Sequence, residues 1–136
     1  MGRPVLIAYD GSDDAQAAVD RATELFPERA AMVLTVRESA EALAGAAETT
    51  AAEGAVLARA RGGHATAISA KSTGNVASSI LAEAVRIDAA AVVMGTRGRS
   101  TVKATSLGSV SAAVSATSRR PVLVVRAPAL ESEGIA

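Results

Sequence analysis

The sequence predicts an α/β domain built on one open, five-stranded parallel sheet of the Rossmann-like kind. Short apolar segments rich in β-branched residues alternate along the chain with segments that carry a helical hydrophobic period. The strand candidates are continuously apolar, as strands buried on both faces of a sheet are. Right-handed crossovers place the connecting helices over both faces, so we expect two helices on each face.

Five segments have strand character, and the third is the most polar, which favours a place at the edge of the sheet. The expected strands are residues 5–9, 31–36, 65–70, 89–94 and 122–126. Residues 1–126 are expected to form one domain, and residues 127–136 a loose C-terminal tail.

Helical periodicity and end signals predict four helices between these strands. The expected helices are residues 13–26, 42–61, 76–87, and a last one from Gly108 to the stop at Arg119-Arg120-Pro121. Ser12 and Asn75 can cap the first and third helices, because their side-chain oxygens accept from free backbone N–H groups. Leu25 and Val85 fall on the apolar faces and are expected to be buried.

We expect the strand order 3-2-1-4-5, in which the first and fourth strands are neighbours. In open α/β sheets the ligand crevice lies at the carboxyl ends of strands, where the winding direction reverses. Asp10 ends the first strand and Gly95 ends the fourth, so this order brings both to the crevice. The order is inferred from where the chemistry would have to meet.

The run MGTRGRSTVKATSLGSV contains Gly95, then Gly98 after two residues, and Gly108-Ser109 after nine more. A strand, a glycine loop and a helix N-terminus form an anion site, because free N–H groups and the helix dipole converge there. Gly95 and Gly98 are expected to permit positive φ and a close approach of the ligand. Arg97, with Arg99 and Lys103, adds positive charge. The spacing alone is equally compatible with ordinary turn glycines.

Composition excludes several classes of function. Fourteen basic residues balance fourteen acidic ones, so we expect neither nucleic acid nor an anionic membrane as a partner. The chain has no cysteine, which removes thiol catalysis and zinc-thiolate sites. The apolar run near the N-terminus is too short for a signal peptide core or a membrane span, which leads us to expect a cytoplasmic protein.

Three segments resemble the universal stress protein family, specifically its ATP-binding branch with the pattern Gly-x2-Gly-x9-Gly-Ser/Thr. These are VLIAYDGSDDAQAAVDRATEL, then VVMGTRGRS followed by LGSVS, and the closing RRPVLVVR. The resemblance spans nearly the whole chain, and the three segments match in the right order. It implies a small nucleotide-dependent regulator of stress adaptation with ATP in the crevice.

The resemblance also implies a role for individual residues. Asp10 would meet the ribose or a phosphate-bound Mg²⁺, while Ala8, Val36 and Met94 would border the adenine. The phosphate contacts would come from the residues of the glycine motif, Gly95, Gly98, Gly108, Ser109 and Val110. The loop would place Arg97 near them. A homodimer would form through the last strand, Val122 to Arg126, which is an apolar edge.

Two departures from the family pattern affect the expected site. The segment before the third glycine is polar, with Thr101, Lys103, Thr105 and Ser106, and the second strand ends in Thr35-Val36 where the family usually has His-Val. Base selectivity is therefore open. Two other functions also stay open: a slow ATPase or autokinase that uses the same site, and a nucleotide-free dimeric scaffold.

No residue is assigned to catalysis. His64 follows Gly62-Gly63, far along the chain from the glycine motif, and is expected in a solvated loop. The serines of the last helix have no nearby histidine and are expected to be caps or surface hydroxyls. The acidic residues of the first helix are expected on a plain solvated face: Asp13, Asp14, Asp20 and Glu24.

Overall fold

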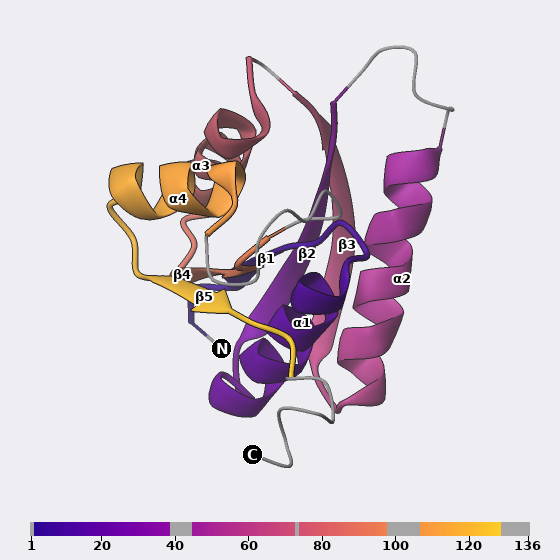
Figure 1. Ribbon diagram of the computed structural model, residues 1–136. Coiled ribbons are helices and arrows are strands. Elements are labelled where there is room, and N and C mark those ends of the chain that lie inside the picture. The colour runs from indigo at the N-terminus through magenta and orange to yellow at the C-terminus, as the bar shows by residue number, and fades with distance from the viewer. Residues whose placement is uncertain (1, 39–44, 73, 98–106, 129–136) are drawn as a thin grey trace, which may run out of the picture.

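The computed structural model describes residues 2–38, 45–72, 74–97 and 107–128. Five strands and four helices alternate in these segments, and the strands pair in parallel in the order β3-β2-β1-β4-β5. This confirms the expected α/β sheet and its order (Figure 1). The elements are β1 (Val5–Ala8), α1 (Asp13–Leu25), β2 (Ala30–Arg37), α2 (Ala46–Ala60), β3 (His64–Lys71), α3 (Val76–Arg86), β4 (Ala91–Gly95), α4 (Ser109–Thr117) and β5 (Val122–Val125).

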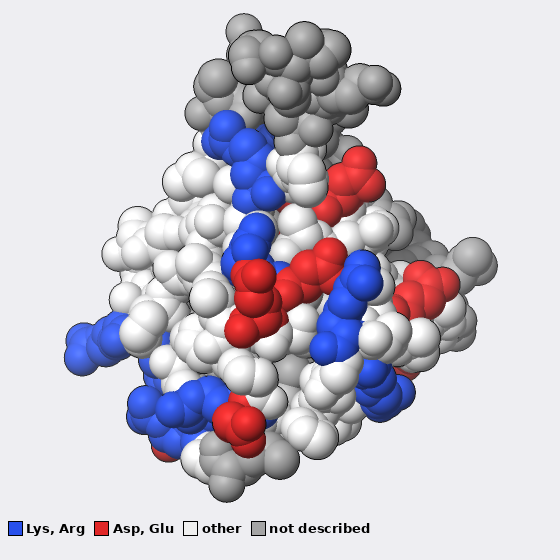
Figure 2. All heavy atoms as spheres, turned by 90° about the horizontal axis from the view of Figure 1, so that it is seen from below, with Lys and Arg blue, Asp and Glu red and all other residues white. Residues whose placement is uncertain are grey.

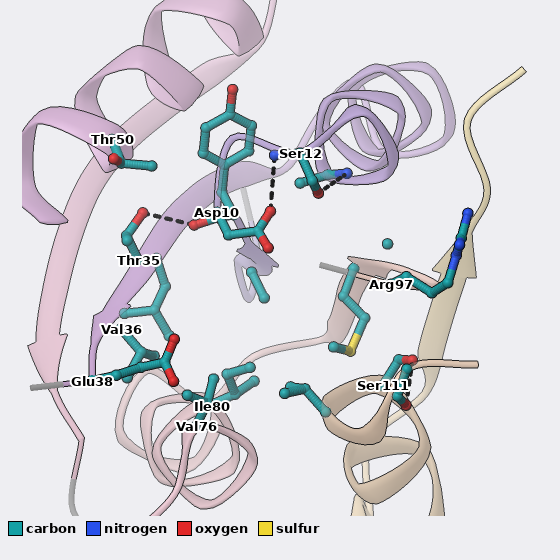
Figure 3. A pocket seen from close by; sticks show the side chains of 18 of the residues that line it. Asp10, Ser12, Thr35, Val36, Glu38, Thr50, Val76, Ile80, Arg97 and Ser111 are labelled. Carbon is teal, nitrogen blue, oxygen red and sulfur yellow. Dashed lines mark hydrogen bonds between the residues drawn. The ribbon is translucent and has the colours of Figure 1, made fainter. Parts of the chain in front are cut away.

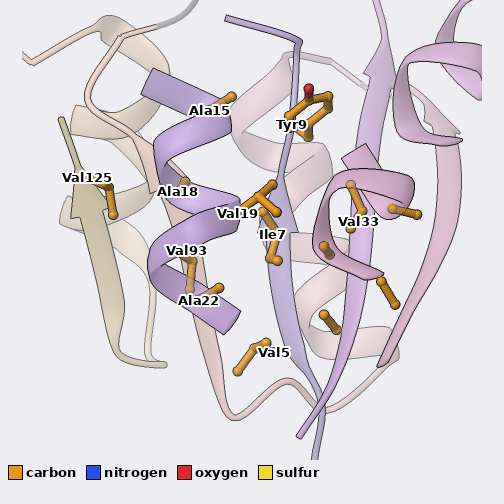
Figure 4. Packing of buried hydrophobic residues seen from close by; sticks show 14 of the residues in the cluster. Val5, Ile7, Tyr9, Ala15, Ala18, Val19, Ala22, Val33, Val93 and Val125 are labelled. Atoms are coloured by element: carbon orange, nitrogen blue, oxygen red, sulfur yellow. The ribbon is translucent and has the colours of Figure 1, made fainter. Parts of the chain in front are cut away.

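Two apolar layers bury the two faces of the sheet. One layer packs α1 and α2 against one face and is built around Val5, Ile7 and Val33 (Figure 4). The other packs α3 and α4 against the opposite face and is built around Leu6, Leu34 and Val92. Neighbouring residues of a strand thus enter opposite layers, which is why the strands are apolar without alternation.

Close packing on the α2 side depends on a residue without a side chain. A Cβ built at Gly54 of α2 would lie 2.8 Å from the ring of Tyr9 and 2.8 Å from a methyl group of Val33. Such contacts are far inside van der Waals distance, so only glycine lets α2 approach the sheet this closely. Tyr9 itself is 7% exposed, and Figure 4 shows its ring extending between α1 and the α2 side of the layer.

The two expected helix caps are present. The side chain of Ser12 accepts from the Ala15 N–H at 3.2 Å, and that of Asn75 accepts from the Ser78 N–H at 2.8 Å. Each satisfies a donor that has no partner inside the helix, so the short side chains fix where α1 and α3 begin. Edge placement of β3, the most polar strand, is confirmed as well.

Two side chains expected in the core are on the surface. Leu25 is 52% exposed and Val85 is 64% exposed. The buried stripe of α3 runs through Ala77, Ile80 and Ala84, and Val85 is one residue, about 100° of helical rotation, beyond it. Leu25 is the last residue of α1 and lies three residues beyond Ala22, the last buried residue of the helix.

The surface seen from below in Figure 2 carries Lys and Arg next to Asp and Glu without a field of one sign. Asp88, whose φ is 52°, contacts Arg3 at 3.6 Å and Arg120 at 3.1 Å, and so joins the start of the chain to the loop before β5. Among the described residues, no helix is both long and apolar enough to cross a membrane.

Candidate functional site

The crevice lies where β1 and β4 run side by side at the centre of the sheet. Val5, Leu6 and Ile7 pair in parallel with Ala91, Val92 and Val93. The winding reverses between these two strands, because β2 and β3 follow on one side and β5 on the other. Asp10 and Gly95 therefore emerge at the same edge of the sheet, as the strand order predicts.

A cavity of about 580 Å³ opens at this point. Its wall combines the carboxyl ends of β1, β2 and β4 with the first turn of α4, part of α3 and the first turns of α2. In Figure 3, Asp10 and Ser12 lie on one side of the cavity, and Val76 and Ile80 of α3 lie on the opposite side. Cavities of this size and mixed polarity are typical of small-molecule sites.

The structure brings together every described residue that the sequence predicted for the site. Those that line the cavity are Ala8, Asp10, Val36, Met94, Gly95, Arg97, Gly108, Ser109 and Val110. Gly98, the remaining predicted residue, lies outside the described residues, as do Arg99 and Lys103. The predicted residues come from four separate segments, so their meeting is a result of the sheet order.

The N-terminus of α4 opens on the cavity, and its first backbone donors have no hydrogen-bond acceptor among the described residues. Gly108 is the N-cap residue, and no side chain of the described residues caps the helix. The first intrahelical bond runs from the Ala112 N–H to the Gly108 carbonyl, at 2.9 Å, so the N–H groups of Ser109, Val110 and Ser111 precede the helical ladder. Together with the positive end of the helix dipole, these donors suit an anion.

The amide of Gly108 has a different partner. Its N–H donates to the Thr96 carbonyl at 2.6 Å, and its φ is −73°, which any residue can adopt. A Cβ at this position would lie 3.2 Å from that carbonyl oxygen and 3.3 Å from the Cα of Arg97. Gly108 thus closes the junction between β4 and α4, and the free amides begin one residue later.

The carboxylate of Asp10 closes a turn after β1 and also lines the cavity. Its Oδ1 accepts from the Ser12 N–H at 2.9 Å, which forms a local turn at the exit of β1. Next to it, the Thr35 hydroxyl donates to the Tyr9 carbonyl at 2.7 Å and holds the ends of β1 and β2 together. The carboxylate retains its second oxygen for a ligand hydroxyl or a cation.

Asp14 is buried, which corrects the expectation that it lies on a solvated helix face. It is 7% exposed, Thr96 donates to its Oδ2, and the Ala127 N–H donates to its Oδ1 at 2.8 Å. Burial acts to raise the pKa of this carboxyl, but these bonds, a bond from the Arg97 N–H and the Arg97 charge outweigh it and lower the pKa. The net effect of these contacts is to favour the ionised form of Asp14 in the fold.

Gly95 is required by packing rather than by a positive φ, which corrects the reason given for it from the sequence. It ends β4, and its φ is not in the left-handed region. A Cβ built there would lie 2.6 Å from the Asp14 Cβ and 3.0 Å from the Ala15 nitrogen. The absence of a side chain lets the first turn of α1 lie directly on the end of β4.

Several residues of the cavity wall were not predicted. They include Ser12, Thr35, Glu38, Thr50, Val76 and Ile80. Thr35 and Glu38 follow from the rule that carboxyl ends of parallel strands share one edge, since both belong to the end of β2 or the residues beyond it. Thr50 and the α3 residues could not be found in this way, because only the packing angle of a helix decides which of its turns reaches a crevice.

The described side chains around the cavity offer few ligands for a tightly bound metal ion. Among the described residues, no group of three or more His, Cys, Asp or Glu side chains comes together as a metal site would need. His64 begins β3 and is exposed at the amino end of that strand, away from the carboxyl ends that form the cavity. A cation at Asp10 would therefore need further oxygens from a bound ligand, as is common for Mg²⁺ beside a nucleotide.

Fold and crevice together define a doubly wound α/β domain with an anion-ready helix N-terminus at its switch point. The model of the universal stress protein family matches residues 1–126. The chain belongs to the universal stress protein family, which confirms the resemblance that the three motif segments indicated. None of the curated proteins compared with the chain matches it.

Solved structures agree with this assignment. A universal stress protein from Archaeoglobus fulgidus superposes with a TM-score of 0.80 at 22% identity, covering 92% of this chain and 99% of that one. The same organism's protein in complex with dAMP gives 0.74 at 22% identity, covering 91% and 98%. A universal stress protein in complex with cAMP gives 0.72 at 26% identity, covering 93% and 98%.

Proposed function

We propose that this protein is a nucleotide-binding regulator that holds ATP in the crevice between β1 and β4. The main support is the N-terminus of α4, whose Ser109 and Val110 amides lie uncapped on a cavity that also contains Asp10. Polyphosphate is a suitable ligand for such amides, because several donors and the helix dipole meet its charge at one point. Relatives with bound dAMP and cAMP support an adenine nucleotide as the class of ligand.

The base would lie on aliphatic surface at the other end of the cavity. Val36 and Met94 line this part, together with Val76 and Ile80 of α3. These side chains offer apolar contact and no base-specific hydrogen bond, so selection among bases would depend on the backbone at the end of β2. The ribose would then lie beside Asp10, whose second carboxylate oxygen can accept from a hydroxyl group.

Arg97 supports the assignment of phosphates to the α4 end of the cavity. Its Nε is buried and has no hydrogen-bond partner among the described residues. A buried donor without a partner costs free energy, of the order of 1–3 kcal/mol. A phosphate oxygen would be a matching acceptor once the Arg97 side chain turns toward the cavity, from which it points away in Figure 3, because hydrogen bonds between guanidinium and phosphate are charge-assisted.

Holding ATP is favoured over hydrolysing it. Hydrolysis needs a metal, an oriented water and neutralisation of charge in the transition state. Asp10 is the one acidic side chain at the phosphate half of the described cavity wall, since Glu38 lies beyond Val36 at the end of β2. ATP would therefore act as a bound signal whose presence alters the surface offered to a partner. Slow hydrolysis of ATP at the same site is the alternative that the experiments below test.

The first experiment asks whether the purified protein carries a nucleotide. The protein is denatured and the supernatant is separated by anion-exchange chromatography, then ATP, dAMP and cAMP are titrated against nucleotide-free protein by calorimetry. Retention of intact ATP and tighter binding of ATP than of dAMP supports the proposal. An empty protein that binds none of the three would instead favour the nucleotide-free scaffold.

The second experiment separates binding from catalysis. Protein is incubated with ATP and Mg²⁺, and ADP is followed over hours, with Asp10→Asn as the variant. Asparagine keeps an acceptor for the Ser12 N–H and so preserves the turn, while it removes the charge that a metal would need. Steady ADP release that disappears in Asp10→Asn would assign the protein as an ATPase.

We also propose a homodimer through β5. The strand is an edge of the sheet, and Val122, Leu123 and Val124 are only partly buried. An apolar edge of this kind is satisfied by pairing with a second copy. Sedimentation at several concentrations tests this, with Val124→Lys expected to shift the protein toward monomer. A cytoplasmic location, and the loose tail at 127–136, stay predictions from the sequence.

A further inference from the structure

Thr96 connects four parts of the fold through backbone and side-chain bonds. Its N–H donates to the Val125 carbonyl at 2.9 Å, and its carbonyl accepts from the Gly108 N–H at 2.6 Å and from the Ser111 hydroxyl at 2.5 Å. Its hydroxyl donates to Asp14. We call this set, with the Ala127 N–H that also bonds Asp14, the Thr96 junction. Its members belong to α1, the end of β4, the start of α4 and the chain around the end of β5.

The two ends of the Thr96 junction hold two different parts of the chain in place. One end fixes Gly108 and Ser111, which bracket the uncapped amides of Ser109 and Val110. The other end fixes Val125 and Ala127, at the exit of the edge strand β5. The side chains that join the two ends are nearly inaccessible, since Asp14 is 7%, Thr96 is 5% and Ser111 is 2% exposed.

We propose that Asp14 is a positioning residue that links nucleotide binding at α4 to the order of the chain leaving β5. A carboxylate can accept from several donors at once, and here it holds Thr96 and Ala127 in one arrangement. A ligand that fixes the first turn of α4 would also fix Thr96, and through Asp14 the exit of β5. The inference rests on the proposed function, because it concerns the same phosphate site.

The linkage must be reciprocal. If an ordered junction favours the nucleotide, then the nucleotide favours the ordered junction by the same free energy. A bound nucleotide should therefore slow hydrogen exchange in the segment 122–128, whose last backbone N–H is that of Ala127, although the phosphate site lies at α4. The edge strand β5 is also the surface proposed for the dimer, so its order is what a partner would sense.

Asp14→Asn is the informative variant, because asparagine keeps the shape but replaces one acceptor oxygen by a donor amide. Asp13→Asn is the matched control, since Asp13 is in the same helical turn, removes the same charge and is exposed. Thr96→Val removes the hydroxyl while it keeps the β-branched shape, and Thr96→Ser restores it. Each variant is measured as the full chain, by ATP titration and by hydrogen exchange of residues 107–114 and 122–128.

We expect Asp14→Asn and Thr96→Val each to weaken ATP binding by about 5-fold to 20-fold, within the usual range of coupling between sites. Their effects should be less than additive in the double variant, because both disturb the same contact between Asp14 and Thr96. ATP should slow exchange of residues 122–128 in the wild type, Asp13→Asn and Thr96→Ser, and not in Asp14→Asn.

Two results would overturn the linkage. In the first, Asp14→Asn lowers the melting temperature but keeps wild-type ATP affinity and the ATP-induced protection of residues 122–128, which makes Asp14 a purely structural residue. In the second, hydrogen exchange in the ligand-free Asp14→Asn protein is faster than in the wild type for only one of the two segments, 107–114 or 122–128. This comparison needs no ligand, so a wild type that binds no nucleotide would end the proposed function while the linkage is still decided.

Discussion

The Cβ of Asp14 lies directly over Gly95, so close that a Cβ added to the glycine would be 2.6 Å away. This contact joins the first turn of α1 to the end of β4, two segments that are 81 positions apart between residues 14 and 95. It gives the first glycine of the motif a role in folding. A ligand can then approach this end of the sheet because α1 and β4 pack together at the edge of the crevice.

Gly95→Ala should therefore destabilise the fold. The added methyl group must displace helix backbone at Asp14 and Ala15, and overpacking of this kind costs about 1–3 kcal/mol. Urea unfolding measures the change. Gly108→Ala is the milder comparison, since its nearest contact would be 3.2 Å. Equal stability of Gly95→Ala and the wild type would show that α1 can move away without cost.

Ser109→Pro tests the free amides of α4 without disturbing the helix. Proline is favoured at the first helical position, and Gly108, with ψ of 165°, has the extended backbone required before a proline. ATP affinity should fall about 10-fold or more, because a hydrogen bond to a charged group contributes about 1.5–3 kcal/mol. Stability should stay within about 0.5 kcal/mol.

Ser109→Ala is the matched control for Ser109→Pro. It removes the hydroxyl and keeps the N–H, so the difference in ATP affinity between the alanine and proline variants isolates the amide. Unchanged calorimetric affinity in Ser109→Pro would place the phosphates elsewhere in the cavity.

The lowered pKa of Asp14 makes part of the stability depend on pH. A carboxyl whose pKa is lower in the folded state stabilises the fold above its unfolded pKa, and this contribution is lost as the pH falls through the folded pKa. The stability gap between wild type and Asp14→Asn should be full at pH 7 and shrink below about pH 4. Urea unfolding of both proteins across this range, with Asp13→Asn beside them, measures it; a gap that widened in acid would contradict the assignment.

The two faces of α3 predict opposite effects of truncation. Ile80 is 2% exposed and lies between α3 and the sheet, so Ile80→Ala should cost about 2–5 kcal/mol. Val85 is 64% exposed, and Val85→Ala should be neutral within about 0.5 kcal/mol, helped by the higher helix propensity of alanine. Thermal melting distinguishes the two, and similar losses would mean that Val85 is buried in solution.

Local patterns in the sequence were sufficient for the elements, whereas the strand order was inferred from where Asp10 and Gly95 would have to meet. Ser12 and Asn75 mark helix starts because a cap acts on amides only three residues away. Continuous apolar strands separated by helical periods indicate a parallel sheet, and a shared crevice for Asp10 and Gly95 then requires the first and fourth strands to be neighbours. The glycine spacing pointed to residues that line the cavity, although Gly98 lies outside the described residues.

Only the tertiary structure decided which residues are buried by distant partners. Asp14 is an ordinary acidic residue of a first helical turn until Thr96 and Ala127, 82 and 113 residues away, surround its carboxylate. Val85 has the composition of a core residue but lies just past the stripe that meets the sheet. Periodicity reports the residues within a turn of each position, whereas burial depends on the angle at which whole elements meet, and no local pattern contains that angle.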